Sequence, residues 1–367
     1  MNKKRPTERE IIEQLRRGQV SLPPLSIRLL EGELEASRER RLDAAIEVSW
    51  REHTVTFAVE CKSLATPRAF RDGLNWLKLA ALPEGYRPLL IMPFLREQHL
   101  QELEREGISG LDLCGNGVVV VPGVLAVFRS GGKNRFSSSA PIKNIYRKNS
   151  SLVGRVFLAR SSYDAVQEVH AEINQRNLLV NRWSKGPMSL STVSKALKTL
   201  EEDLVVERDG AIRLLQPDTL LQKLRENYTH PRAKERVRLK LPEGSGPVQA
   251  WLQKQAQALN LPMVATGTSS VTQYAVMKRG DLLSVYCPRV EALLDRLPPS
   301  QPDRFPNLEL IETEDETAYF DARQDGNFWW ASPVQVYLEL MAGDKRDQET
   351  AEQVKSFLLT NLGRVLP

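Results

Sequence analysis

The sequence contains few of the residues that build disulfide frameworks, metal centres or membrane spans. Among its 367 residues there are three cysteines and four histidines. The cysteines (Cys61, Cys114 and Cys287) are far apart, so we expect neither a disulfide framework nor a zinc ribbon, and we expect a reducing compartment. The histidines do not cluster, which argues against a histidine-based metal site or catalytic triad. No apolar run approaches the length of a membrane span and no apolar targeting segment opens the sequence, so we expect a cytoplasmic protein without membrane contact.

Acidic residues are also absent from one long stretch, between Asp112 and Asp164. The basic residues of that stretch are Arg129, Lys133, Arg135, Lys143, Arg147, Lys148, Arg155 and Arg160. Residues 241–367 carry 11 Lys and Arg against 17 Asp and Glu, whereas the other 240 residues carry 40 against 29. This asymmetry is typical of a polyanion-binding body joined to a partner-facing domain. The alternative is an evenly charged, soluble surface in which the Gly- and Ser-rich part of the stretch is an exposed linker.

The length and the order of the patterns predict a multidomain chain of the α/β and α+β classes. Helical apolar spacing covers residues 6–36, and two alternating runs, 42–50 and 53–63, predict a β-hairpin. Helices at 67–82 and 96–107 and a buried strand at 87–95 follow. We therefore predict three domains: an α/β domain at 1–140, a winged helix-turn-helix at 150–230, and a C-terminal α/β domain at 231–367.

The strongest local signal is a helix followed by a hairpin, at residues 186–215. Leu190, Val193, Leu197 and Leu200 share one helical face, which we expect to be packed. The hairpin turns at Asp209-Gly210. The residues expected to contact double-stranded DNA are Ser191, Thr192, Ser194, Lys195 and Lys198 on the helix, and Arg208 and Arg213 on the wing. The alternative is an amphipathic helix with a hairpin in any α+β domain, and residues 174–188 make a longer connection than a compact helix-turn-helix has.

A second constellation has the spacing D-x16-E-x-K. Asp43 lies on one strand of the predicted hairpin, and Glu60 and Lys62 share a face of the other strand, because side chains alternate along a strand. Two carboxylates can hold Mg²⁺, and the lysine can position a hydroxide or stabilise charge on phosphorus. Glu33 or Glu35, on the predicted preceding helix, would add a third carboxylate. The alternative is an exposed Lys–Glu pair on a strand edge.

The spacing and the order helix, strand, strand, helix, strand resemble the PD-(D/E)XK restriction-endonuclease-like fold. The whole chain resembles the AbiEi-type antitoxins of type IV toxin–antitoxin systems, in the variety with a nuclease-like segment ahead of the winged helix. Three stretches carry this resemblance: residues 107–123 with 131–136, the helix and hairpin continuing into 220–228, and residues 330–359. In better-known members the winged helix is N-terminal, whereas here it is central.

The resemblance implies a transcriptional regulator that represses its own operon and counteracts a nucleotidyltransferase-like toxin without a tight complex. We expect a monomer or weak dimer that needs no cofactor to bind DNA. A second hypothesis is a Mg²⁺-dependent DNA nuclease targeted by the winged helix, and a third is an adaptor whose C-terminal domain recruits a partner. Gly267-Thr268-Ser269-Ser270 is faintly similar to a nucleotidyltransferase motif, but the required D-x-D strand does not follow it, so nucleotidyl transfer is not expected.

Overall fold

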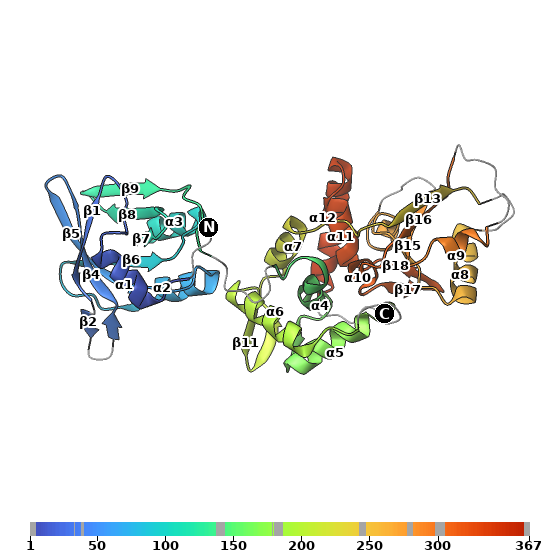
Figure 1. The fold of residues 1–367 in the computed structure, drawn as a ribbon, viewed down its shortest axis with the longest axis horizontal. Helices are drawn as coiled ribbons and strands as arrows, with labels where there is room; N and C mark the ends of the chain where they lie inside the picture. Colours follow the sequence, from blue (N-terminus) through green and yellow to red (C-terminus); the bar gives the residue numbers. More distant parts are fainter. Residues whose placement is uncertain are drawn as a thin grey trace. The chain divides into compact units, whose positions relative to one another are not determined.

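The computed structural model describes residues 5–32, 34–37, 40–136, 144–177, 179, 186–241, 247–276, 282–297 and 305–362. The chain divides into two units, Met1–Pro141 and Ile142–Pro367, called here the first and second unit. Both units combine helices with mixed sheets, which confirms the α/β class of the chain (Figure 1). No helix among the described residues is both long and apolar enough to cross a membrane.

A seven-stranded sheet forms the centre of the described part of the first unit. Its strands lie in the order β1 (Ser26–Glu31), β4 (Ala44–Trp50), β5 (His53–Cys61), β6 (Tyr86–Met92), β7 (Ser109–Asp112), β8 (Gly117–Val121) and β9 (Leu125–Arg129). Strands β5, β6 and β7 are parallel to one another, and the other neighbours are antiparallel. A separate hairpin of β2 (Leu34–Ser37) and β3 (Arg40–Leu42) precedes β4. The carboxyl ends of the three parallel strands therefore meet at one edge of the sheet.

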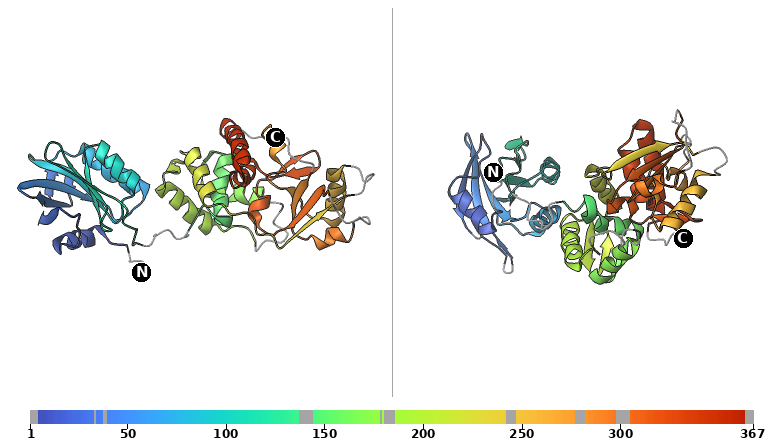
Figure 2. Two further views of the ribbon diagram at one scale, coloured as in Figure 1. Left: turned by 90° about the horizontal axis from the view of Figure 1, so that it is seen from above. Right: turned by 45° about the vertical axis from the view of Figure 1, so that its right-hand side comes forward.

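Three helices cover the two faces of this sheet: α1 (Glu8–Arg16) lies on one face, and α2 (Pro67–Leu79) and α3 (Glu97–Arg105) lie on the other (Figure 2). Helices α1 and α2 begin at residues whose side chains can cap them. Thr7 and Glu10 form a capping box at α1, and Thr66 caps α2 ahead of a proline. Gly107, at φ +66°, follows α3, as the sequence predicts.

The prediction of helical structure over residues 6–36 is wrong beyond Arg16. Gly18, at φ +65°, follows α1, and Pro23-Pro24 cannot continue a helix. The next apolar residues, Ile27 and Leu29, alternate with exposed ones on β1, which pairs with β4. Residue 35 also lies on a strand, so the expected third carboxylate does not come from a helix. Glu33 lies outside the described residues, as does the side chain of Glu35.

The second unit begins with a helix–strand–helix–helix–hairpin segment. Its elements are η1 (Lys148–Ser151), α4 (Leu152–Ala159), β10 (Ser162–Tyr163), α5 (Val166–Arg176), α6 (Leu190–Glu202), β11 (Val206–Asp209), β12 (Ala211–Leu214) and α7 (Pro217–Glu226). The three strands form a sheet in the order β10-β12-β11. Gly210, at φ +71°, makes the turn between β11 and β12, which confirms the predicted hairpin.

A six-stranded mixed sheet follows. Its order is β13 (Glu235–Leu239), β16 (Leu308–Glu312), β15 (Leu283–Cys287), β14 (Val264–Ala265), β18 (Phe328–Trp330) and β17 (Arg323–Asp325). The helices around it are α8 (Val248–Leu259), η2 (Val271–Gln273), α9 (Glu291–Leu294), α10 (Glu316–Tyr319), α11 (Pro333–Met341) and α12 (Lys345–Thr360). Residues of α8 and α9 pack against one face of the sheet, and residues of α10, α11 and α12 pack against the other.

One hydrophobic core joins these two parts of the second unit. All nine residues of α11 are buried, and six of them share a single hydrophobic cluster with residues of α4, α5, α6 and α7. Polar contacts cross the same junction: Arg176 pairs with Asp321, and Asn177 Nδ2 donates to Glu316 Oε2 (3.0 Å). The segments expected as separate domains at 150–230 and 231–367 thus lie in one compact unit.

Candidate nucleic-acid interface

Helix α6 has one packed face and one exposed face. Val193, Leu197 and Leu200 are buried in the core of the second unit, as the apolar spacing predicts. The prediction is wrong for Leu190, which is 41% exposed at the first position of the helix. Ser189 is the N-cap: its side chain accepts the backbone N–H of Thr192 (3.2 Å). Because Ser189 takes this role, Ser191 points outward on the first turn.

The outward face carries four of the residues predicted to contact DNA. Ser191, Ser194, Lys195 and Lys198 are exposed. Thr192 is half-buried, and its hydroxyl lies 2.9 Å from that of Ser189. Neither lysine forms an ion pair within the part of the chain that the structure describes. This face therefore offers small hydroxyl groups and two ammonium groups whose charge is not neutralised by those residues.

The hairpin places the two predicted arginines beside acidic residues. Arg208 Nη1 lies 4.0 Å from Glu201 Oε2, and Arg213 Nη1 lies 4.0 Å from Glu207 Oε1. Ion pairs at this distance on an exposed surface contribute little to stability. Both arginines can therefore turn to another anion at small energetic cost.

Two polar residues of α5 anchor the connection that leads into α6. His170 Nε2 donates to the carbonyl oxygen of Met188 (2.7 Å), and Asn174 Oδ1 accepts the backbone N–H of Met188 (3.0 Å). The start of α6 is therefore fixed against α5, although the connection is longer than in a compact helix-turn-helix. The sequence interpretation missed these two residues, and their i, i+4 spacing on one helix was the available signal.

The second constellation lies at the carboxyl end of β5. Strand β4 pairs with β5 from Ala44 opposite Val59 onward, so the register places Asp43 opposite Glu60. Glu60 Oε1 lies 2.6 Å from Lys62 Nζ, on the face covered by α2. Asp43 Oδ2 accepts the backbone N–H of Cys61 (2.6 Å). The structure thus brings the three predicted residues to one strand end, where each has a protein partner.

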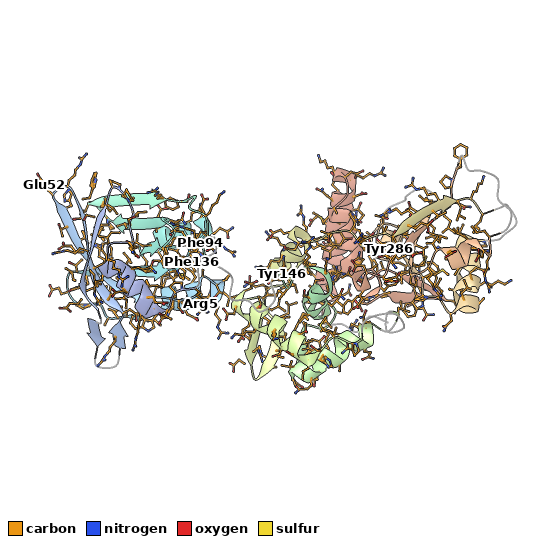
Figure 3. All side chains as sticks on the ribbon, in the orientation of Figure 1. Arg5, Glu52, Phe94, Phe136, Tyr146 and Tyr286 are labelled. Carbon is orange, nitrogen blue, oxygen red and sulfur yellow. The ribbon has the colours of Figure 1, made fainter. Side chains whose placement is uncertain are left out.

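Burial and charge together set the protonation behaviour of this strand end. Burial raises the pKa of Glu60, against the effect of its hydrogen bond to Lys62, and the charges of Asp43 and Glu8 raise it further. Burial alone would lower the pKa of Lys62, but the hydrogen bond to Glu60 and the negative charges of Glu60, Glu8 and Asp43 together outweigh burial, and the pKa is raised. Arg5 holds the chain ahead of α1 against this end, because its Nε donates to Ser63 O (2.9 Å) (Figure 3).

The acidic residues do not gather into a larger cluster. Among the described side chains, no group of three or more His, Cys, Asp and Glu residues is placed to hold a metal ion. Asp43 and Glu60 are therefore the pair at this strand end that could bind a divalent cation, and Glu60 would have to exchange its contact with Lys62 for the cation.

A tight turn closes the same edge of the sheet after β7. The carboxylate of Asp112 is buried and accepts four N–H groups, from Leu95, Cys114 and, twice, Asn116. Gly115 adopts φ +90° within the turn. Asn116 in turn binds the backbone of Gly132 at both its N–H (2.7 Å) and its carbonyl group (3.2 Å). These contacts account for the Asp112, Gly115 and Asn116 motif as a structural clamp.

Comparisons of the chain with protein-family models, curated proteins and solved structures found no match. The functional interpretation therefore depends on the geometry of α6 with its hairpin and of the strand end at Asp43, Glu60 and Lys62.

Proposed function

We propose that this protein is a duplex-DNA-binding transcriptional regulator of antitoxin type, which represses its own operon through α6 and the β11–β12 hairpin. The observation that carries the proposal is the element order α4, β10, α5, α6, β11 and β12, with its sheet order β10-β12-β11. This is the order of a winged helix-turn-helix, in which the last helix enters the major groove and the hairpin flanks it.

The exposed residues of α6 suit this role. Ser191 and Ser194 are small enough to let the helix approach the base edges, where hydroxyl groups can donate or accept hydrogen bonds. Lys195 and Lys198, farther along the helix, would contact phosphates, and Arg208 and Arg213 would do so from the wing. The resemblance to AbiEi-type antitoxins suggests a nucleotidyltransferase-like toxin as the second partner.

The test is titration of the purified full chain onto its own upstream DNA, measured by fluorescence anisotropy at several salt concentrations. We expect Lys195→Ala/Lys198→Ala to weaken binding and to lower the slope of log K against log salt by about two. The control is Lys254→Ala/Lys345→Ala, which removes the same charge from exposed positions on α8 and α12. Equal affinity and slope for the two double variants would refute the assignment of α6 as the DNA-reading helix.

A second candidate function is Mg²⁺-dependent DNA cleavage at the end of β5. It is favoured by the order α1, β1, β4, β5, α2 and β6, in which β5 and β6 are parallel, and by Asp43 lying opposite Glu60. This order resembles that of PD-(D/E)XK nucleases, in which two carboxylates bind the cation. Nicking of supercoiled plasmid with Mg²⁺ or Mn²⁺ tests it. Cleavage that is lost in Asp43→Asn while DNA binding is retained would support the nuclease function. Absence of cleavage by the wild-type protein would refute it, and the proposed regulator function would stand alone.

A further inference from the structure

Arg155 is a buried cation without an acidic partner in contact. The residue is 4% exposed and lies in α4. Its Nη1 donates to the carbonyl oxygen of Thr317 (3.2 Å) and to Gln335 Oε1 (2.9 Å), and its Nε has no hydrogen-bond partner among the described residues. No ion pair joins Arg155 to a described carboxylate.

The positive charge of Arg155 is linked to a buried carboxylate only through an intervening side chain. Gln335 lies between Arg155 and the buried Glu339. Its Oε1 accepts a hydrogen bond from Arg155, and its Nε2 donates one to Glu339 Oε1 (2.9 Å). The carboxylate of Glu339 is itself occupied by Tyr286 Oη (3.0 Å) and by the backbone N–H of Thr268 (3.3 Å). A buried charge is costly unless it is paired and its donors are satisfied. Arg155 therefore has the capacity to bind one more acceptor, preferably an anionic one.

A small polar pocket gives access to Arg155. Its cavity volume is about 10 Å³, and the pocket is partly open to solvent. Its wall includes Lys148, Ser151, Asn227, Thr229, Asp315 and Thr317. Lys148 is exposed, and it opens the helical turn η1 that runs into α4. Tyr146, also on the wall, is fixed by donation from its hydroxyl to Asp203 Oδ2 (2.5 Å) (Figure 3).

The charges around the pocket are unequal. The wall includes two basic residues, Arg155 and Lys148, and one acidic residue, Asp315, whose Oδ1 already accepts the N–H and the hydroxyl of Thr317. The hydroxyl groups of Ser151 and Thr317 already donate to Lys148 O and Asp315 Oδ1, so the further donors on the wall are the Thr229 hydroxyl and the second N–H of the Asn227 amide. Such a donor set suits a tetrahedral oxyanion.

We propose that this pocket binds a phosphate group, with Arg155 and Lys148 as its two cationic contacts. The pocket lies where α4 meets the loop before α10, so the bound phosphate would bridge the DNA-facing part and the C-terminal part of the second unit. The group can belong to a small phosphorylated molecule or to the backbone of DNA. The inference does not depend on the proposed DNA binding, because inorganic phosphate alone suffices to test it.

The experiment is calorimetric titration of inorganic phosphate into the full chain, with ionic strength held constant by chloride. We expect saturable binding of one phosphate per chain. Lys148→Gln is expected to weaken it by roughly tenfold, the effect of losing one hydrogen bond to a charged group, and Asp315→Asn is expected to strengthen it. Lys254→Gln removes the same charge from α8 and is expected to leave the affinity unchanged. Lys148 is exposed, so its substitution leaves the fold intact, whereas Arg155 also holds Thr317 and Gln335.

The source of the phosphate is distinguished with promoter DNA. Competition between phosphate and DNA, with weaker DNA binding by Lys148→Gln, would identify a backbone phosphate. Phosphate binding that persists beside bound DNA would identify a small molecule. The proposal is overturned if the wild-type protein shows no saturable phosphate binding in the millimolar range, or if Lys148→Gln and Lys254→Gln bind phosphate equally well.

Discussion

Asn116 donates two hydrogen bonds to the carboxylate of Asp112, one from its backbone N–H (2.8 Å) and one from its side-chain amide (2.7 Å). The same side chain holds Gly132, so a single pair of residues ties the end of β7 to the chain that follows β9. No space for a Cβ remains at Gly132, which would meet the carbonyl oxygen of Cys114 at 2.6 Å. The Asp112–Asn116 pair thus fixes two segments that belong to no helix or strand, namely the turn after β7 and the chain at Gly132.

Loss of the Asp112 carboxylate should destabilise the first unit. Asp112→Ala leaves four buried or half-buried N–H groups without their acceptor, and we expect a loss of about 3 kcal/mol or more in the free energy of unfolding. Urea unfolding followed by hydrogen exchange of β6 and β7 peptides measures it. Asp72→Ala, at an exposed position on α2, is the control. A similar small loss for both variants would contradict the clamp.

The stability of the first unit should depend on pH through His99. Burial, together with the neighbouring Arg96, lowers the pKa of His99 to about 4. The unfolded chain binds a proton near pH 6.5, so the native state loses up to about 3 kcal/mol as the pH falls from 6.5 to 4. His99 also stacks on Phe70 at a centroid distance of 4.3 Å.

The comparison of wild type with His99→Gln isolates this contribution, because the other titrating groups are common to both proteins. Unfolding in urea at pH 7, 6, 5 and 4.5 should show a gap between the two proteins that changes over this window. A gap that stays constant with pH would show that His99 is not held neutral. His53→Gln, at the exposed start of β5, is expected to follow the wild-type profile.

The Glu60–Lys62 pair should be strongly coupled. Lys62→Met leaves a buried carboxylate without its cation, and we expect a loss of about 3 kcal/mol. The double variant Glu60→Gln/Lys62→Met removes the uncompensated charge and should recover much of this loss. A double-mutant cycle in urea measures the coupling. Additive losses would mean that the 2.6 Å contact contributes nothing specific.

Gly267 should tolerate no side chain. An added Cβ would lie 2.8 Å from Glu339 Cδ and 3.0 Å from the backbone Cα of Val336, on a fully buried helix. We expect Gly267→Ala to cost about 3 kcal/mol. Gly154→Ala in α4 meets only the flexible end of Leu220 (3.0 Å) and should change stability little. Hydrogen exchange of α11 peptides in urea compares the two variants, and equal losses would show that the loop at Gly267 can move aside.

Local signals predicted the elements that have local causes. The two-residue turn between β4 and β5, the end of α3 at Gly107 and the hairpin at Gly210 each depend on residues close in sequence. Strand β1 was missed because the apolar residues of 25–30 fit two periodicities, and only pairing with β4 selects the strand. Strands β14, β17 and β18 contain two or three residues each. Such short strands give no sequence pattern, because they are defined by hydrogen bonding to neighbouring strands.

In the candidate sites, too, the features with a local cause were predicted and those that depend on distant chain segments were not. The packed and exposed faces of α6 follow from its period, apart from Leu190 at the first turn, whose side chain is 41% exposed. Alternation along β5 also predicted that Glu60 and Lys62 lie on one face. The burial of Arg155, Gln335 and Glu339 could not be predicted, because polar residues enter a core only where distant chain segments supply their partners.

The core around α11 limits how this chain can be cut and recombined. The first unit has hydrophobic clusters of its own, whereas α6 shares its cluster with α11 and α12. A fragment ending near residue 230 would keep α6 but expose the apolar surface that α11 covers. We therefore do not expect the segment from η1 to α7 to fold by itself. Residues before 142 can therefore be removed or replaced without exposing this core. Residues after 142 are expected to unfold together, in a single cooperative step.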